Sequence, residues 1–141
     1  QLDPLSFPAM MGLGAALLGQ AHYDAAEKEY RKALRLWPDH AEIHHQLGLT
    51  LYRRGVYAAA AQQLRRAIEL DPEHAPSYLV LGEALNQMGE VDAAIEALQE
   101  AIRLQPENPK AYYTLGLAYD RKGQPDRAAE MYRRSREVGG R

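Results

Sequence analysis

The chain of 141 residues contains no cysteine, and this absence excludes several kinds of chemistry at once. Without thiols there is no disulfide framework, no thiolate zinc site, no iron–sulfur cluster held by cysteine and no cysteine nucleophile. An excess of either charge is also missing, since 17 Lys and Arg residues stand against 19 Asp and Glu residues. We therefore expect no nucleic-acid partner, because proteins that bind nucleic acid usually carry a clear basic excess.

Long apolar runs are absent as well. The longest mainly apolar stretch, residues 7–19, is too short for a bilayer, which takes about 20 apolar residues. A secretory signal would place Lys or Arg before such a stretch, whereas Asp3 precedes it here. We expect no membrane insertion and favour a soluble, cytoplasmic protein, although the first residue, Gln1, leaves the compartment open.

Residues that favour strands are scarce. Val, Ile and Thr together number only ten, while Ala and Leu are abundant. Because β-branched side chains favour strands, this composition predicts an all-α protein. A chain of this length can bury roughly two thirds of its unfolded surface, so a substantial core is expected.

A repeat of 34 residues runs through the sequence. The pair Leu-Gly recurs with this spacing at Leu13-Gly14, Leu47-Gly48, Leu81-Gly82 and Leu115-Gly116. Alanines follow in a constant register at Ala26, Ala60, Ala94 and Ala128, and prolines at Pro38, Pro72 and Pro106. Four units are therefore predicted, over residues 7–40, 41–74, 75–108 and 109–141, with residues 1–6 as the tail of a preceding repeat or a linker.

Each unit has the pattern of two amphipathic helices. In the second unit we expect them at about 41–54 and 58–70. Gly55 suits a helix end that needs a left-handed residue, and Pro72 ends the second helix because the residue before a proline avoids the helical region. We expect Gly48 and Ala60 at the point where the two helices approach most closely.

This pattern resembles the tetratricopeptide repeat, a helix–turn–helix unit with Leu-Gly, Ala and Pro at fixed offsets. The resemblance covers essentially the whole chain and implies a right-handed superhelical α-solenoid. The bulky residue three before each Leu is Met10, His44, Tyr78 or Tyr112 here. The family's Trp is therefore missing from this position in all four units, but the exchanges do not threaten the fold.

The resemblance also implies a function, because repeats of this family line a concave groove that binds a partner peptide or helix. Tyr52 and Tyr113 are expected as anchors, since aromatic side chains bury much area at low entropy cost. Leu49 and Leu117 are expected either to add apolar surface or simply to pack between neighbouring helices. Carried over by register, the expected partner-binding residues are Met11, Leu18, His45, Leu49, Tyr52, Arg53, Glu83, Asn86, Tyr113, Leu117, Asp120 and Arg121.

The sequence offers little support for catalysis or metal binding. His40, His44 and His45 form the one histidine cluster, but no third ligand is evident, and we expect no metal and no cofactor. Serine is scarce and never lies in a GxSxG context. The arginines over residues 133–136 are interpreted as a solvated helix face.

The sequence therefore predicts a non-enzymatic protein-interaction scaffold. One alternative is a module that self-associates through exposed terminal helices, because the first helix is apolar on nearly every side while a terminal repeat usually has a polar outer face. Another is a region appended to a larger enzyme or signalling protein. The apolar first helix also suggests a fragment of a longer array.

Overall fold

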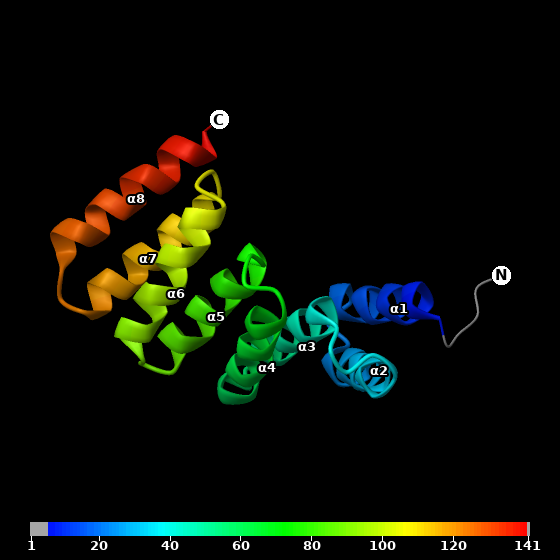
Figure 1. Ribbon diagram of the computed structural model, residues 1–141. Coiled ribbons are helices and arrows are strands. Elements are labelled where there is room, and N and C mark those ends of the chain that lie inside the picture. Colours follow the sequence, from blue (N-terminus) through cyan, green and yellow to red (C-terminus); the bar gives the residue numbers. More distant parts are fainter. Residues whose placement is uncertain (1–5, 141) are drawn as a thin grey trace. The chain divides into compact units, whose positions relative to one another are not determined.

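The computed structural model describes residues 6–140, and in this range the chain forms eight α-helices and no strand (Figure 1). In chain order the helices are α1 (Phe7–Gly19), α2 (Tyr23–Leu36), α3 (Ala41–Arg54), α4 (Tyr57–Leu70), α5 (Ala75–Gln87), α6 (Val91–Leu104), α7 (Pro109–Arg121) and α8 (Pro125–Gly139). We call the first helix of each successive pair an A helix and the second a B helix. Of the predicted tail or linker at residues 1–6, only Ser6 falls among the described residues, and its hydroxyl caps α1 by accepting from Ala9 N at 3.2 Å.

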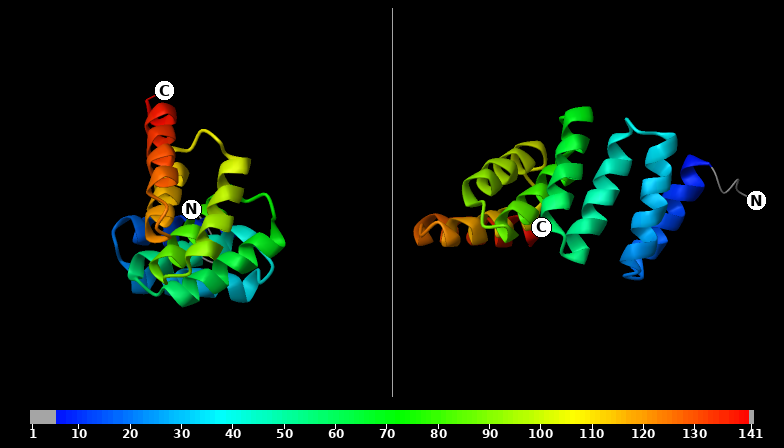
Figure 2. Two further views of the ribbon diagram at one scale, coloured as in Figure 1. Left: turned by 90° about the vertical axis from the view of Figure 1, so that its left-hand side faces the viewer. Right: turned by 90° about the horizontal axis from the view of Figure 1, so that it is seen from below.

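The helices group into two compact units, which divide between Pro72 and Glu73. Unit 1 contains α1 to α4 and unit 2 contains α5 to α8. Within each unit every helix packs against the next one along the chain, and the two A helices also contact each other (Figures 1 and 2). Each unit is therefore two stacked helix hairpins. The predicted all-α solenoid of helix–turn–helix repeats is confirmed, while the handedness of its superhelix stays a prediction.

Left-handed residues connect the two helices of each pair. Gly55 follows α3 with φ of 88°, as the sequence predicts, and Gly89 and Gly123 follow α5 and α7 with φ of 79° each. In the first pair the same position is Ala21, with φ of 61°. A Cβ atom makes this conformation costly, so the first connection carries backbone strain that the other three avoid.

Small residues allow the helices of a pair to approach closely. A Cβ atom added to Gly48 would lie 2.7 Å from Leu64 Cγ and 3.3 Å from the Ala60 carbonyl oxygen. The predicted close approach of Gly48 and Ala60 is therefore confirmed. In the first and last pairs the side chain that lies against the glycine is a tyrosine: Tyr30 lies against Gly14, and Tyr132 against Gly116.

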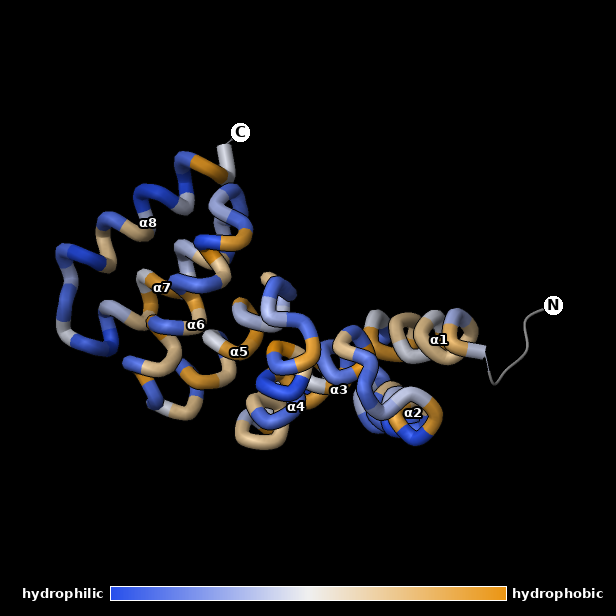
Figure 3. The backbone as a smooth tube through the Cα atoms, in the orientation of Figure 1, coloured by the Kyte–Doolittle hydropathy of each residue, from blue (hydrophilic) through white to orange (hydrophobic). Residues whose placement is uncertain are grey.

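The core of each unit lies between its A and B helices. In unit 1, Tyr30, Leu47 and Leu64 are completely buried. In unit 2, Leu98 and Leu115 belong to one cluster that α5, α6, α7 and α8 all enter. Hydropathy differs most between the first and last helices, since α1 is mainly hydrophobic and α8 mainly hydrophilic (Figure 3).

Candidate partner-binding site

The expected binding residues lie on the A helices of both units. We call the exposed side of α1 and α3 the unit-1 face, carrying Met11, Ala15, Glu42, Gln46, Leu49, Tyr52 and Arg53. On α5 and α7 the expected residues and their neighbours form what we call the unit-2 face. It comprises the buried Glu83 and Asn86 and the exposed Lys110, Tyr113, Leu117, Asp120 and Arg121. Residues four apart on a helix share one side, which is why these positions form a continuous surface within each unit.

On the unit-1 face the expected residues differ in accessibility. Met11, Leu49 and Tyr52 are half-buried, and Arg53 is exposed. The Tyr52 ring lies 5.6 Å from the Tyr57 ring, measured between centroids. Tyr52 therefore presents one part of its ring to solvent and packs another part on α4.

Two expected binding residues of unit 1 are buried. Leu18 is 6% exposed and belongs to the core, and His45 is 5% exposed. Leu18 is buried because it lies one turn beyond Gly14 on the side of α1 that faces α2. Neither side chain offers appreciable surface to a partner, so their predicted role in binding receives no support from their position.

The unit-2 face exposes two large hydrophobic side chains one helical turn apart. Tyr113 is 50% exposed and Leu117 is 37% exposed, both on α7. Tyr113 lies 5.5 Å from the Tyr132 ring between centroids, and the Tyr132 hydroxyl donates to Asp120 Oδ2 at 2.7 Å. Asp120 thus orders the tyrosine on which Tyr113 packs.

Buried polar groups lie beside these hydrophobic residues. Glu83 is 9% exposed and its Oε1 lies 3.6 Å from Lys110 Nζ. Asn86 is 6% exposed, and its backbone carbonyl accepts from Arg121. Glu83 Oε1 and Asn86 Oδ1 have no hydrogen-bond partner within the described part of the chain. Glu83 and Asn86 are therefore buried acceptors that offer as little surface to a partner as Leu18 and His45 do, whereas Tyr113 and Leu117 are exposed.

The unit-1 face also contains a pocket that the sequence does not predict. Its volume is about 340 Å³. Seven residues of three helices line it: Phe7, Met11, Gly12 and Ala15 of α1, Tyr30 of α2, and Glu42 and Gln46 of α3. Of these, only Met11 is among the twelve expected binding residues. Tyr30 was missed because it belongs to a B helix and reaches this side only by crossing over Gly14.

The hydroxyl groups of Tyr30 and Tyr132 have unusual environments. Burial, with a smaller effect of the Glu42 carboxylate, raises the pKa of Tyr30 to about 12. Burial also raises the pKa of Tyr132 to about 12, helped by the hydrogen bond to Asp120 and by its negative charge. Both groups stay protonated at neutral pH.

The histidine cluster has structural contacts. His44 Nδ1 lies 2.8 Å from Gln63 Oε1 and its Nε2 lies 2.7 Å from the Pro38 carbonyl oxygen, so both ring nitrogens are already engaged. His40 stacks on Phe7, with ring centroids 4.4 Å apart. In residues 6–140 no group of three or more His, Asp or Glu side chains is arranged to hold a metal ion.

One serine lies against a histidine without forming a reactive site. Ser77 Oγ is 2.8 Å from His74 Nδ1, but Ser77 is completely buried near the start of α5. A substrate could not reach its hydroxyl, and a nucleophile must be within reach of the reacting atom. The pair therefore stabilises the beginning of a helix.

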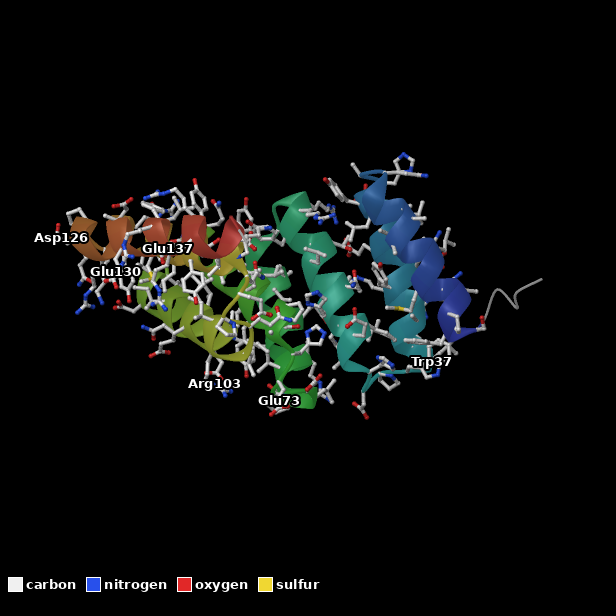
Figure 4. All side chains as sticks on the ribbon, turned by 90° about the horizontal axis from the view of Figure 1, so that it is seen from above. Trp37, Glu73, Arg103, Asp126, Glu130 and Glu137 are labelled. Carbon is white, nitrogen blue, oxygen red and sulfur yellow. The ribbon has the colours of Figure 1, made fainter. Side chains whose placement is uncertain are left out.

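The arginines near the end of the chain lie on α8, beside acidic residues. Asp126, Glu130 and Glu137 project from the same helix (Figure 4). Arg133 pairs with Glu137 at 2.6 Å, and the Arg134 guanidinium lies 5.0 Å from the centre of the Tyr112 ring. These contacts on an exposed helix agree with the interpretation as a solvated surface.

None of the described helices combines the length and the apolarity that a bilayer span requires.

Family comparisons agree with this geometry. Residues 11–75, 51–100 and 110–137 match family models described as tetratricopeptide repeat, and residues 82–123 match one described as TPR repeat. The crystal structure of MamA is 31% identical in sequence, with a TM-score of 0.88, over 98% of this chain and 81% of that one. The chain belongs to the tetratricopeptide repeat family. No curated protein matches it by sequence.

Two further solved structures have folds similar to that of this chain. A MamA structure from Desulfovibrio magneticus RS-1 is 29% identical, with a TM-score of 0.87, over 97% of this chain and 76% of that one. YrrB, described as a TPR protein with an unusual peptide-binding site, is 24% identical with a TM-score of 0.83, over 96% of this chain and 70% of that one. The YrrB likeness concerns the fold alone.

Proposed function

We propose that this chain is a protein-interaction scaffold whose A-helix faces bind a partner helix or an extended peptide. The observation that carries the proposal is the exposed pair Tyr113 and Leu117 on α7. Two large hydrophobic side chains one helical turn apart present an apolar surface on which the apolar face of a partner helix can lie. Aromatic side chains are also enriched among residues that dominate binding energy.

Polar groups on the same face support this proposal. Glu83 and Asn86 hold acceptor oxygens that lack a hydrogen-bond partner in the described residues, and both lie on α5. An unsatisfied buried acceptor costs free energy. Both oxygens are shielded from solvent, so a partner donor removes that cost only where binding moves the side chains that cover them. Hydrophobic anchors beside such acceptors give both affinity and orientation.

The contacts of the described residues favour a binding function over a catalytic one. Ser77 is buried, and both nitrogens of His44 are engaged by other groups. The expected partner is therefore a protein or a peptide.

Selection from a displayed library of helical peptides against the whole chain tests the proposal. We expect the selected peptides to bind Tyr113→Ala at least about tenfold more weakly than the natural chain, as removal of a dominant anchor does. Tyr23→Ala is the matched control, since Tyr23 is a half-buried tyrosine at the start of the B helix α2. Equal loss in both variants, or no loss in Tyr113→Ala, would contradict binding at the unit-2 face.

Self-association is a second candidate, favoured by one observation. Leu13 is 48% exposed on α1, a helix whose 13 residues carry no charge. Covering this surface with a second copy would bury apolar area. Light scattering over a concentration series should then show dimers or larger species that Leu13→Gln reduces. A strictly monomeric mass at every concentration would exclude this candidate.

A further inference from the structure

The pocket on the unit-1 face contains a buried hydroxyl group without a hydrogen-bond partner. Tyr30 forms part of the pocket wall and is 0% exposed. Its hydroxyl makes no hydrogen bond to any described residue. Such a group is costly in a folded protein and is usually satisfied by water, by another residue or by a ligand.

The fourth repeat shows how the same tyrosine is satisfied elsewhere in the chain. Tyr132 occupies the register of Tyr30, and its ring lies over Gly116 as that of Tyr30 lies over Gly14. The Tyr132 hydroxyl donates to Asp120. In the first repeat the position of Asp120 is Leu18, whose side chain cannot form a hydrogen bond. The first repeat therefore lacks, at position 18, the carboxylate to which the tyrosine hydroxyl donates in the fourth repeat.

The charge of the pocket indicates what could occupy it. Glu42 is the one charged residue in its lining, so the lining is negative and contains no cation. Gln46 Nε2 donates to Glu42 Oε1 at 2.9 Å, which leaves the Gln46 amide oxygen as a further acceptor. Hydrogen-bond acceptors thus come from three side chains, Tyr30, Glu42 and Gln46, and most of the remaining lining is apolar.

We propose that this pocket receives an arginine side chain of the bound partner. The inference rests on the proposed function, because it assigns one side chain of the peptide that binds the A-helix face. The guanidinium pairs with the Glu42 carboxylate, while the aliphatic part of the side chain packs on Met11 and Ala15. One remaining N–H group faces the Gln46 amide oxygen. Another reaches the Tyr30 hydroxyl oxygen, which is shielded from solvent, once the bound side chain displaces the lining that covers it.

Arginine fits this lining better than the other basic side chain. A guanidinium has five N–H donors in a fixed plane, is more weakly hydrated than an ammonium group and stacks on aromatic rings. The pocket offers several acceptors and the rings of Tyr30 and Phe7. A volume of about 340 Å³ falls at the lower end of ordinary ligand pockets, roughly 300–1,000 Å³.

Titration of the whole chain with capped single amino acids tests this proposal without a known partner. The probe is N-acetyl-arginine amide, and the readout is the shift of backbone amide signals in two-dimensional NMR spectra. We expect the signals of Gly12 and Ala15 to move with a Kd on the order of 1 mM, as is usual for a ligand of about 15 heavy atoms. N-acetyl-citrulline amide, which has the same shape without the charge, should bind at least about fivefold more weakly.

Three variants and one control separate the contributions of the lining. Glu42→Gln should weaken arginine binding about fivefold or more, while Glu69→Gln, which removes a carboxylate from α4, should leave it unchanged. Tyr30→Phe should weaken it about threefold. Ala15→Lys should abolish it, because a lysine at this exposed position of the lining both fills the pocket and neutralises its charge.

The outcomes also separate this proposal from the proposed function. If citrulline binds as well as arginine, or if Glu42→Gln binds arginine like the natural chain, the pocket does not select arginine and the proposal is refuted. If the displayed peptides still require Tyr113 in that case, the proposed function stands without this pocket. Arginine affinity that Tyr30→Phe leaves unchanged would overturn the role given to the Tyr30 hydroxyl.

Discussion

Replacing Tyr30 by phenylalanine should change the stability of the chain in the opposite direction from replacing Tyr132, the equivalent tyrosine of the fourth repeat. Tyr30 and Tyr132 occupy the same position in the first and fourth repeats, and each variant removes one oxygen atom. The Tyr30 hydroxyl is buried without a partner, whereas the Tyr132 hydroxyl donates to Asp120 at 2.7 Å. Tyr30→Phe should therefore stabilise the chain, and Tyr132→Phe should destabilise it.

The magnitudes follow from the two environments. An unsatisfied buried polar group costs about 1–3 kcal/mol, and the void left by one oxygen atom offsets part of that gain. We expect Tyr30→Phe to raise the free energy of unfolding by about 1 kcal/mol. A hydrogen bond to a carboxylate is worth about 1.5–3 kcal/mol when buried, but this one is exposed to solvent. For Tyr132→Phe we expect a loss of about 0.5–1 kcal/mol.

Urea denaturation measures both changes. Trp37 is the single tryptophan of the chain and lies in unit 1 between α2 and α3, with its ring 5.4 Å from that of Phe7 (Figure 4). Its fluorescence therefore follows the unfolding of unit 1, which contains Tyr30, while circular dichroism follows both units. If Tyr30→Phe lowers the free energy of unfolding as much as Tyr132→Phe does, the Tyr30 hydroxyl has a partner and the reasoning about the pocket is wrong.

Two further predictions concern the backbone and pH. Ala21→Gly should stabilise the chain by about 0.5–1 kcal/mol, because Ala21 has φ of 61° and glycine adopts this region without a steric cost. Gly55→Ala should destabilise the chain by a similar amount. If the melting temperatures of both variants shift in the same direction in thermal melts, the backbone strain assigned to Ala21 is contradicted. Folding raises the pKa of Tyr30 from 10.0 to about 12. The contribution of the neutral Tyr30 hydroxyl to the free energy of unfolding is therefore complete below pH 10 and is lost as the pH rises towards 12. The advantage of Tyr30→Phe over the natural chain should therefore grow between pH 10 and 11.5, by up to about 1.4 kcal/mol per pH unit, and urea titrations showing a constant or shrinking advantage would refute the shift.

The repeat register predicts most of the fold because each recurring position has a local physical cause. Gly55 must adopt a left-handed conformation, and Gly48 must lie against Leu64, whatever the rest of the chain does. The bounds of α3 agree with the predicted 41–54, and α4 begins one residue before the predicted 58. Such features depend on neighbours that are close in sequence or lie within one helix pair.

The binding faces could be predicted less well, because accessibility depends on contacts between helices. The register places Leu18 and Tyr52 at equivalent positions, yet Leu18 is buried and Tyr52 is half-buried. The pocket was missed for a similar reason, since Tyr30 reaches the unit-1 face from a B helix. A signal was nevertheless present, because the register pairs Tyr30 with Tyr132 and Leu18 with Asp120. Comparing these pairs would have shown that the first repeat lacks the polar partner of its tyrosine.

The central claim is that the A-helix faces bind the partner, and mapping a bound peptide tests it most directly. A peptide selected on the whole chain is titrated against the isotope-labelled protein, and its effect on each backbone amide signal is recorded. We expect the largest shifts on α3 and α7, around Tyr52 and Tyr113, with little change along α4 and α8. Largest shifts along the B helices, or shifts confined to the connections between helices, would contradict the account.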